Sequence, residues 1–218
     1  NNKLVFVADD KVHGNELWEY SGSGQPVLLA DIWPGIFDSD PESFAIIDNT
    51  LYFSAEDSAH GQEIWVYDGL NPPEMLVDLQ PGPQGSFPGG FASFKNKIYF
   101  HAYDPIHGME LWVYDGTHTP TLVADINPGE ENSGCWGKIV FNNKLYFNAN
   151  DGIHGYELWE YDGENPPVMV ADIYPGQEGT LTFRMLVYKQ KLYFAANDGI
   201  HGNELWEYDG VHTPVMVA

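Results

Sequence analysis

The chain repeats itself every 47 residues, without an insertion or a deletion. Each copy opens on an apolar residue, and a histidine and a tryptophan follow at fixed distances. The opening residues are Leu4, Leu51, Ile98, Leu145 and Leu192; the histidines are His13, His60, His107, His154 and His201; the tryptophans are Trp18, Trp65, Trp112, Trp159 and Trp206. A period of 20–50 residues is typical of repeat proteins, in which each unit buries its apolar face against its neighbours. The repeat therefore constrains the fold far more than the chemistry.

One copy divides into four short apolar runs separated by turn residues. In the second copy, run a covers residues 44–47, run b 51–55, run c 63–67 and run d 75–79. Aromatic and β-branched residues fill these runs, and no segment has a helical period over a sufficient length. The pattern predicts an antiparallel β-meander in every copy.

Four-stranded units of this length that repeat without helices are typical of a β-propeller. We therefore expect an all-β fold, a five-bladed β-propeller formed by a single domain over residues 1–218. Its repeat units are 1–47, 48–94, 95–141, 142–188 and a truncated 189–218. Runs b, c and d occur five times but run a only four times, so one a-strand is missing at the closure of the ring. We expect the unpaired edge to serve assembly, or to be completed by a longer parent chain.

Composition excludes several partners. Nine Lys and Arg against 32 Asp and Glu give a formal charge of −23, which repels phosphate backbones and excludes nucleic acid as a partner. No apolar stretch approaches the ~18 residues of a spanning helix, so we expect no membrane insertion. Cys135 is the only cysteine and has no thiolate-activating partner in the sequence. The chain starts at Asn1, which indicates a processed protein or an excised domain.

Three motifs carry a family resemblance that covers the whole chain. They are Glu110-Leu111-Trp112-Val113-Tyr114-Asp115-Gly116-Thr117, Asp151-Gly152-Ile153-His154-Gly155-Tyr156-Glu157-Leu158-Trp159 and Asp125-Ile126-Asn127-Pro128-Gly129. The chain resembles the ELWxxDGT-repeat β-propellers of large secreted or surface proteins of bacteria. The resemblance implies an extracellular or cell-surface location and an architecture more than an activity.

Strand alternation sorts the connections onto two faces. The a–b and c–d turns emerge on one face, and the b–c and d–a loops on the other, which we call the top face. The d–a loops differ most between copies, and variable loops on a rigid scaffold are where binding usually occurs. Phe37, Phe87 and Trp136 lie in these loops without a repeat role, as contact residues or as loop plugs.

Every copy also carries the pattern Asp-x-x-His-x-x-Glu on its b–c loop. We consider three roles for it: a hydrogen-bonded clasp that braces the blades, a divalent-cation site, and a sugar site. The candidate ligand-binding residues are His13, Glu16, His60, Glu63, His107, Glu110, His154, Glu157, His201 and Glu204, together with Phe37, Phe87 and Trp136. The candidate metal ligands are Asp10, Asp57, Asp104, Asp151 and Asp198, with Asp31, Asp78, Asp125 and Asp172 at the ends of the d runs. No cofactor is required, and calcium is the cation that an all-oxygen set favours.

The sequence alone predicts a non-enzymatic, extracellular binding or adhesion module. Its top face would recognise a glycan or a protein, in a multivalent, lectin-like manner. The alternative is a structural scaffold or protein-interaction subunit of a larger surface assembly, with no small-molecule ligand. We expect no enzymatic activity, because an active site needs one asymmetric constellation and these residues recur fivefold.

Overall fold

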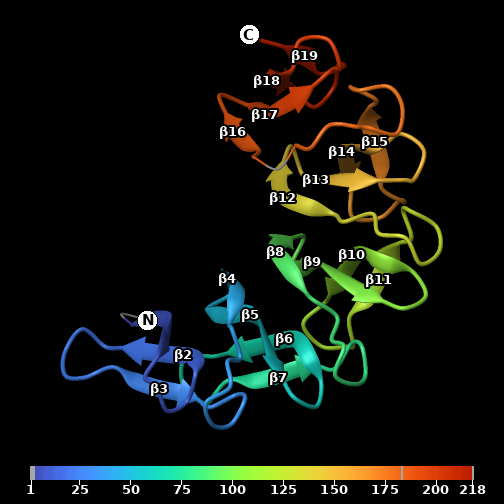
Figure 1. Cartoon of the computed structure of the whole chain (residues 1–218). Coiled ribbons are helices and arrows are strands. Elements are labelled where there is room, and N and C mark those ends of the chain that lie inside the picture. The colour runs from blue at the N-terminus through green and yellow to red at the C-terminus, as the bar shows by residue number, and fades with distance from the viewer. Residues whose placement is uncertain (1–2, 183, 218) are drawn as a thin grey trace. The chain divides into compact units, whose positions relative to one another are not determined.

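The computed structural model describes residues 3–182 and 184–217 and is all-β, without a helix in these residues (Figure 1). Nineteen strands follow one another along them. Their bounds are β1 Leu4–Asp9, β2 Asn15–Tyr20, β3 Val27–Ala30, β4 Glu42–Ile47, β5 Thr50–Asp57, β6 Gly61–Tyr67, β7 Glu74–Val77, β8 Gly89–Phe94, β9 Lys97–Asp104, β10 Gly108–Tyr114, β11 Thr121–Ala124, β12 Trp136–Phe141, β13 Lys144–Asn150, β14 Tyr156–Tyr161, β15 Val168–Ala171, β16 Leu186–Tyr188, β17 Lys191–Asn197, β18 Asn203–Tyr208 and β19 Val215–Met216.

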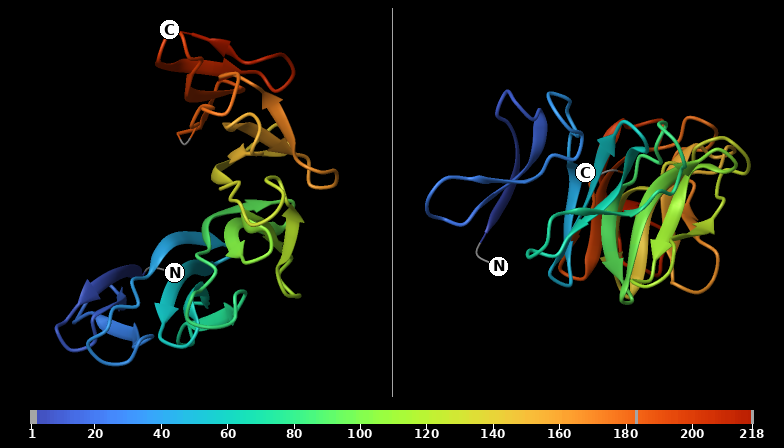
Figure 2. Two further views of the ribbon diagram at one scale, coloured as in Figure 1. Left: turned by 45° about the vertical axis from the view of Figure 1, so that its right-hand side comes forward. Right: turned by 90° about the horizontal axis from the view of Figure 1, so that it is seen from below.

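These strands form five open antiparallel sheets, in which neighbours in the sheet are also neighbours in the sequence (Figure 2). We number them sheet I (β1–β3), sheet II (β4–β7), sheet III (β8–β11), sheet IV (β12–β15) and sheet V (β16–β19). The strands of sheets II to V correspond in order to runs a, b, c and d. Sheet I has three strands and lacks the a-strand, as the count of runs predicts.

The turn between runs a and b is a two-residue hairpin in every four-stranded sheet. Its residues have left-handed φ angles, 48° and 67° at Asp48 and Asn49 and 45° and 58° at Asn142 and Asn143. Two left-handed residues are what a type I′ turn requires, and Asn and Asp tolerate this conformation. The turn fixes the register of each a-strand on its b-strand, for example Ile47 opposite Thr50.

Each apolar cluster is shared by neighbouring sheets. One joins Leu17 of sheet I to Phe53 of sheet II, a second joins sheets III and IV, and a third joins sheets IV and V. The fully buried aromatic position of the repeat is in run b, at Phe53, Phe100, Phe147 and Phe194. The repeated tryptophan is mostly half-buried, and its indole Nε1 donates to a carbonyl of strand b in three copies.

The chain divides into two compact units. The first ends at Phe91 and holds sheets I and II; the second starts at Ala92, inside β8, and holds sheets IV and V with the rest of sheet III. The single-domain organisation stays a prediction. A search of the described residues for a helix long and apolar enough to cross a membrane finds none.

Candidate functional site

The Asp-x-x-His segment of every copy folds into one tight turn on the b–c loop. In sheet II, one carboxylate oxygen of Asp57 accepts the backbone N–H groups of Ala59 and His60 at 2.8 Å, and the other lies 2.9 Å from Nδ1 of the His60 ring. The four other copies repeat the ring contact at 2.7–2.8 Å. The structure therefore places Asp and His together in one local turn, and a clasp that braces the blades stays a prediction.

These contacts shift the pKa values of the aspartate and the histidine. The hydrogen bond to Asp57 raises the pKa of His60, and the negative charge of Asp78 adds to the effect. In sheet I, backbone and side-chain hydrogen bonds from His13 lower the pKa of Asp10 to about 2. The pKa of the histidine is raised in the turns of sheets I to IV, so these turns favour an ion pair, with the carboxylate already engaged by backbone donors.

The same turn occurs on the opposite face, in the c–d connections. Asp115 accepts the backbone N–H groups of Thr117 and His118 at 2.9 Å, and its other oxygen lies 2.8 Å from Nδ1 of His118. Asp209 and His212 repeat it at 2.7 Å, and asparagine takes the place of the histidine beside Asp68 and Asp162. Because one motif builds the connections of both faces, its recurrence is explained by turn formation.

The glutamate of the pattern points away from this turn, into the protein. Glu110 is fully buried and accepts the backbone N–H groups of Ile126 at 3.0 Å and Asn127 at 3.3 Å. It also accepts the hydroxyl of Ser133 at 2.6 Å. The partner serine was not predicted, although Ser39, Ser86 and Ser133 keep the 47-residue spacing. Thr180 takes this position in the fourth copy, where its hydroxyl accepts the backbone N–H of Asn197 at 2.7 Å.

The glutamate therefore ties strand c to the d–a loop that follows strand d. Glu16 and Glu63 bind their loops in the same way, through Ser39 at 2.7 Å and Ser86 at 2.6 Å. Glu157 accepts the N–H groups of Ile173 and Tyr174 at 3.1 and 3.0 Å. Burial raises the pKa of Glu110 and of Glu157 to about 7.

The glycine after each histidine lets the d–a loop approach the b–c loop. Gly61 has a left-handed φ of 67°, and a Cβ there would lie 2.5 Å from the backbone nitrogen of Gly85. At Gly155 it would lie 2.6 Å from the carbonyl oxygen of Gln177. The repeated His-Gly pair is the sequence signal for this contact.

The fifth copy differs from the other four, and the difference shows what the d–a loop contributes to the burial of the glutamate. Gly202 faces open space among the described residues, and Glu204 is only partly buried. The four glutamates that have a d–a loop are all fully buried. The loop, rather than the b–c turn, therefore buries the carboxylate.

The structure separates the members of the expected metal set. Within residues 3–182 and 184–217, no group of three His, Cys, Asp or Glu side chains could hold a metal ion. Asp31 and Asp125 each accept the N–H of a following glycine, at 3.3 and 3.4 Å. One carboxylate oxygen of each of Asp31, Asp78 and Asp125 is buried without a hydrogen-bond partner. A calcium site at these residues stays a prediction.

The three aromatic residues of the d–a loops have different surroundings. Phe37 is exposed and stacks on Trp33 with ring centroids 5.4 Å apart, whereas Trp136 stacks on Tyr156 at 5.2 Å. Phe87 lines an open pocket of about 320 Å³ together with Asp57. The structure thus brings one candidate aromatic residue and one candidate carboxylate into a shared pocket.

One polar cluster departs from the repeat. Lys138 of β12 stands where the other copies have Phe44, Phe91 and Met185, and its Nζ donates to the carbonyl of Cys135 at 2.5 Å and lies 3.4 Å from Nδ1 of His101. Burial lowers the pKa of Lys138 to about 8 and raises that of the Cys135 thiol to about 12. The thiol is therefore protonated at neutral pH, and the departure from the repeat was the signal that could have revealed this cluster.

No family model matches the chain, and no curated protein sequence does. Solved structures do. The β-propeller domain of the Trilobed protease from Pyrococcus furiosus, which has an open velcro topology, matches with a TM-score of 0.62 and 13% identity over 100% of this chain and 66% of that one. A puromycin hydrolase matches with a TM-score of 0.63 and 14% identity over 93% of this chain, and a prolyl endopeptidase with 0.62 and 14% over 98%.

These similarities show a β-propeller fold. The chain spans only 32% of the puromycin hydrolase chain and 34% of the prolyl endopeptidase chain. The resemblance to ELWxxDGT-repeat proteins and the extracellular location stay predictions.

The comparisons overturn the function predicted from the sequence. A non-enzymatic adhesion or lectin-like module, or a scaffold without a ligand, is not supported, because the three matching structures named above are a protease propeller domain, a puromycin hydrolase and a prolyl endopeptidase. The BP39L lectin from Burkholderia pseudomallei matches with a TM-score of only 0.49, which carries no argument. The prediction was wrong for a physical reason: residues that recur fivefold serve to build the sheets and their connections. The Asp-His turns and the buried glutamates described above explain this recurrence without a ligand.

Proposed function

We propose that this chain is a five-bladed β-propeller, each sheet forming one blade, and that it is one domain of a larger peptide-hydrolysing enzyme. The observation that carries the proposal is the extent of the similarity. Nearly the whole chain matches, but it matches about a third of the puromycin hydrolase and prolyl endopeptidase chains. A match of this kind is expected of one domain within a multidomain enzyme.

In this proposal the propeller supplies no catalytic group. The repeated Asp, His and Glu side chains are engaged in turns and in the loop contacts of Glu110 and its equivalents, and the Cys135 thiol is buried and protonated. In two prolyl endopeptidases, inter-domain dynamics has been given a role in catalysis and specificity. We assign the propeller an equivalent role, in admitting substrate to a catalytic domain.

The charge of the chain suggests which substrates it would admit. A formal charge of −23 attracts cationic molecules at long range and repels anionic ones, and salt weakens both effects. We therefore expect the enzyme to prefer peptides with Lys or Arg over peptides with Asp or Glu, most strongly at low ionic strength.

The test is an activity measurement on the natural protein in which this chain occurs, isolated with antibodies raised against the chain. We expect it to hydrolyse puromycin or peptide p-nitroanilides, with kcat/KM higher for basic than for acidic peptides and with that ratio falling as salt is added. The 218-residue chain alone, as the matched control, should hydrolyse neither. A natural protein without peptidase activity on either substrate class would overturn the proposal.

A further inference from the structure

The open pocket beside the b–c loop of sheet II combines aromatic rings with carboxylates. It has a volume of about 320 Å³ and lies where strand β5 ends. Its lining includes Trp33, Glu56, Asp57, Gln62 and Phe87. Two d–a loops and one b–c loop of the first compact unit supply these residues.

Three of these side chains depart from the repeat. The equivalents of Trp33, Glu56 and Phe87 are Gln80, Tyr103 and Gly134 at sheet III, and Asn127, Asn150 and Leu181 at sheet IV. Neither of these sets joins two aromatic rings to a carboxylate. Because residues that build the sheets recur from copy to copy, a combination that sheet II alone has among these three indicates a role other than construction.

Phe87 keeps an unfavourable backbone conformation. Its φ is 49°, in the left-handed region that bulky residues rarely adopt. The equivalents Asp40 and Gly134 have φ angles of 41° and 86°, and both residue types tolerate this region. The loop conformation therefore does not need an aromatic residue here, and strain of this kind is typical of functional positions.

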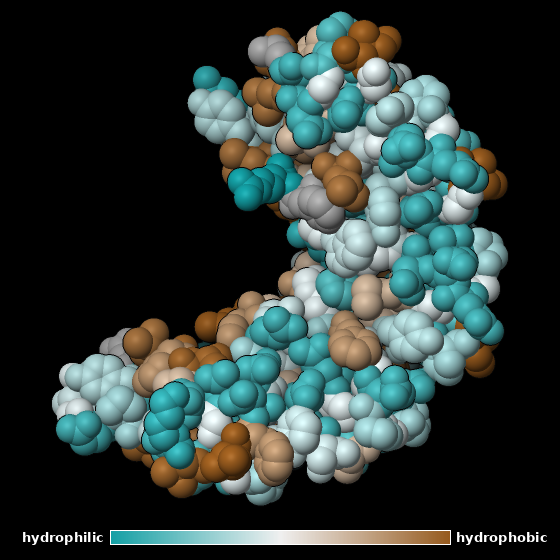
Figure 3. All heavy atoms as spheres, in the orientation of Figure 1, coloured by the Kyte–Doolittle hydropathy of each residue, from teal (hydrophilic) through white to brown (hydrophobic). Residues whose placement is uncertain are grey.

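Both aromatic rings lie at the surface. Phe87 is 47% exposed, and the ring of Phe37 stacks on Trp33 with centroids 5.4 Å apart, which holds the indole. Figure 3 shows brown, apolar atoms among teal, hydrophilic ones on the surface of sheets I and II. The face of an aromatic ring attracts a cation within about 6 Å of its centroid.

The carboxylate of Glu56 has no cationic partner among the described residues. No lysine or arginine of this part of the chain lines the pocket. Burial raises the pKa of Glu56, and the charge of Asp40 adds to the effect. Asp57, by contrast, is already engaged by His60, whose Nδ1 lies 2.9 Å from its carboxylate. A cation in the pocket would therefore stabilise the ionised form of Glu56.

We propose that this pocket binds the guanidinium group of an arginine side chain, which contacts the rings of Trp33 and Phe87 and donates hydrogen bonds to Glu56. A guanidinium group is planar, weakly hydrated and always charged, so it stacks on aromatic rings and pairs with a carboxylate. Calcium suits the pocket less well, because it prefers oxygen ligands all round. A volume of about 320 Å³ is small for a ligand site, which fits one side chain rather than a long peptide.

The probe is Nα-acetyl-arginine amide, and Nα-acetyl-citrulline amide is its neutral control of nearly the same shape. Binding to the 218-residue chain is followed by two-dimensional NMR. We expect saturable shifts of the backbone amides of residues 56–62 and 84–87 and of the indole N–H of Trp33. The citrulline compound should bind at least about tenfold more weakly, the loss typical of a hydrogen bond between charged groups.

Two variants test the residues of the pocket. Phe87→Gly removes the ring at a position where Gly134 shows that the loop accepts glycine, and it should weaken binding at least about fivefold. Glu56→Gln removes the charge but keeps the shape, and it should weaken binding at least about tenfold.

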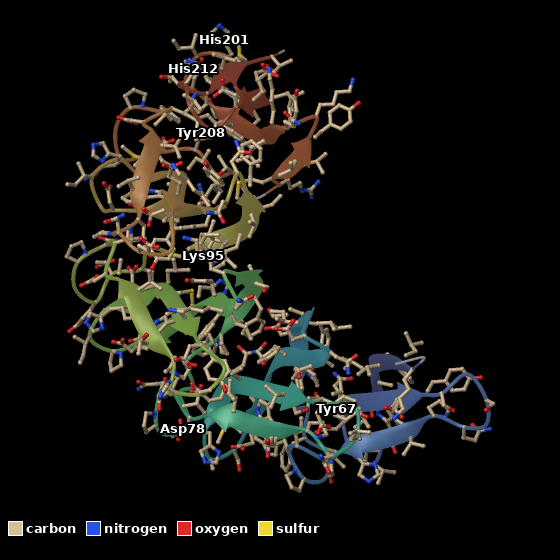
Figure 4. The ribbon with its side chains drawn as sticks, turned by 180° about the vertical axis from the view of Figure 1, so that it is seen from behind. Tyr67, Asp78, Lys95, His201, Tyr208 and His212 are labelled. Carbon is tan, nitrogen blue, oxygen red and sulfur yellow. The ribbon has the colours of Figure 1, made fainter. Side chains whose placement is uncertain are left out.

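The matched control is Glu74→Gln, which changes the net charge of the chain by the same amount. Glu74 is exposed and begins β7, whereas Figure 4 shows Asp78, which follows β7, at the opposite end of sheet II from Tyr67. Since the pocket lies at the end of Asp78, this variant should leave binding unchanged.

Three results overturn the proposal: no saturable shifts, equal affinity for the citrulline compound, or binding that Glu56→Gln does not weaken. Displacement of the arginine compound by calcium overturns it as well, because a metal would then be the occupant. Only the use of the pocket in selecting peptide substrates rests on the proposed function. A chain that binds arginine, from a natural protein without peptidase activity, would support the site and reject the peptidase.

Discussion

Removal of one buried glutamate should destabilise the protein, whereas removal of its equivalent in the fifth copy should not. In Glu110→Ala, the backbone N–H groups of Ile126 and Asn127 lose their acceptor, and the hydroxyl of Ser133 keeps the carbonyl of Met109 and the thiol of Cys135 as partners. A buried donor without a partner costs about 1–3 kcal/mol. Two such donors give an expected loss of about 3 kcal/mol in the free energy of unfolding.

For a protein of this size, ~3 kcal/mol corresponds to a fall of roughly 6–12 °C in Tm. The matched control is Glu204→Ala, where no d–a loop covers the carboxylate among the described residues and the side chain is partly exposed. Its cost should stay within about 0.5 kcal/mol, as for ordinary surface substitutions. Thermal and urea unfolding followed by tryptophan fluorescence measure both variants.

Two results would refute this reasoning. One is a loss below about 1 kcal/mol in Glu110→Ala, which would mean that the loop donors are satisfied without the carboxylate. The other is an equal loss in Glu204→Ala, which would mean that the glutamate stabilises strand c rather than the d–a loop.

Three further predictions concern the loops and the charges. Gly61→Ala should lower Tm by several degrees, because φ is 67° and the new Cβ would meet the backbone of Gly85. Gly202→Ala has the strained φ of 84° without the clash, so it should lower Tm clearly less. Equal losses of Tm by calorimetry would contradict the contact between the d–a loop and the b–c loop. Stability should fall as the pH rises from about 5 to 8, because the folded state keeps protons on groups whose pKa it raises. These are Glu110 and Glu157, with pKa about 7 against 4.5, and His13, His60, His107 and His154, whose pKa is raised above 6.5. A Tm series that rises over this window would contradict the assigned directions. EDTA should leave Tm unchanged, because backbone and side-chain donors already engage the carboxylates of the Asp-His turns and of the buried glutamates. A fall in Tm that added calcium reverses would show a structural metal.

The strands were predictable because each depends on a local pattern. Alternating apolar residues give runs b and c, and the pair Asp48-Asn49 gives the hairpin turn that joins β4 to β5. The role of Glu110 was not predictable from its own segment, since a charged residue is expected at the surface. Its burial depends on a loop 16 to 23 residues later, and only the equal spacing of Ser133 and its equivalents points to that contact.

Function was harder to infer than fold, because the repeated residues are the most visible and serve the architecture. Lys138 is visible only as a departure from the repeat. Its surroundings are not visible in the pattern, because His101, whose Nδ1 lies 3.4 Å from the Lys138 amine, stands 37 residues earlier in the chain.

Amide hydrogen exchange, measured residue by residue at pH 6, tests most directly the claim that the repeated glutamates hold the d–a loops. The first two residues after Asp31, Asp78, Asp125 and Asp172 donate to a buried glutamate, so their amides should exchange slowly in all four copies. In Glu110→Ala, only the amides of Ile126 and Asn127 should lose this protection. Fast exchange at these positions in the unmodified protein, or unchanged protection in the variant, would contradict the account.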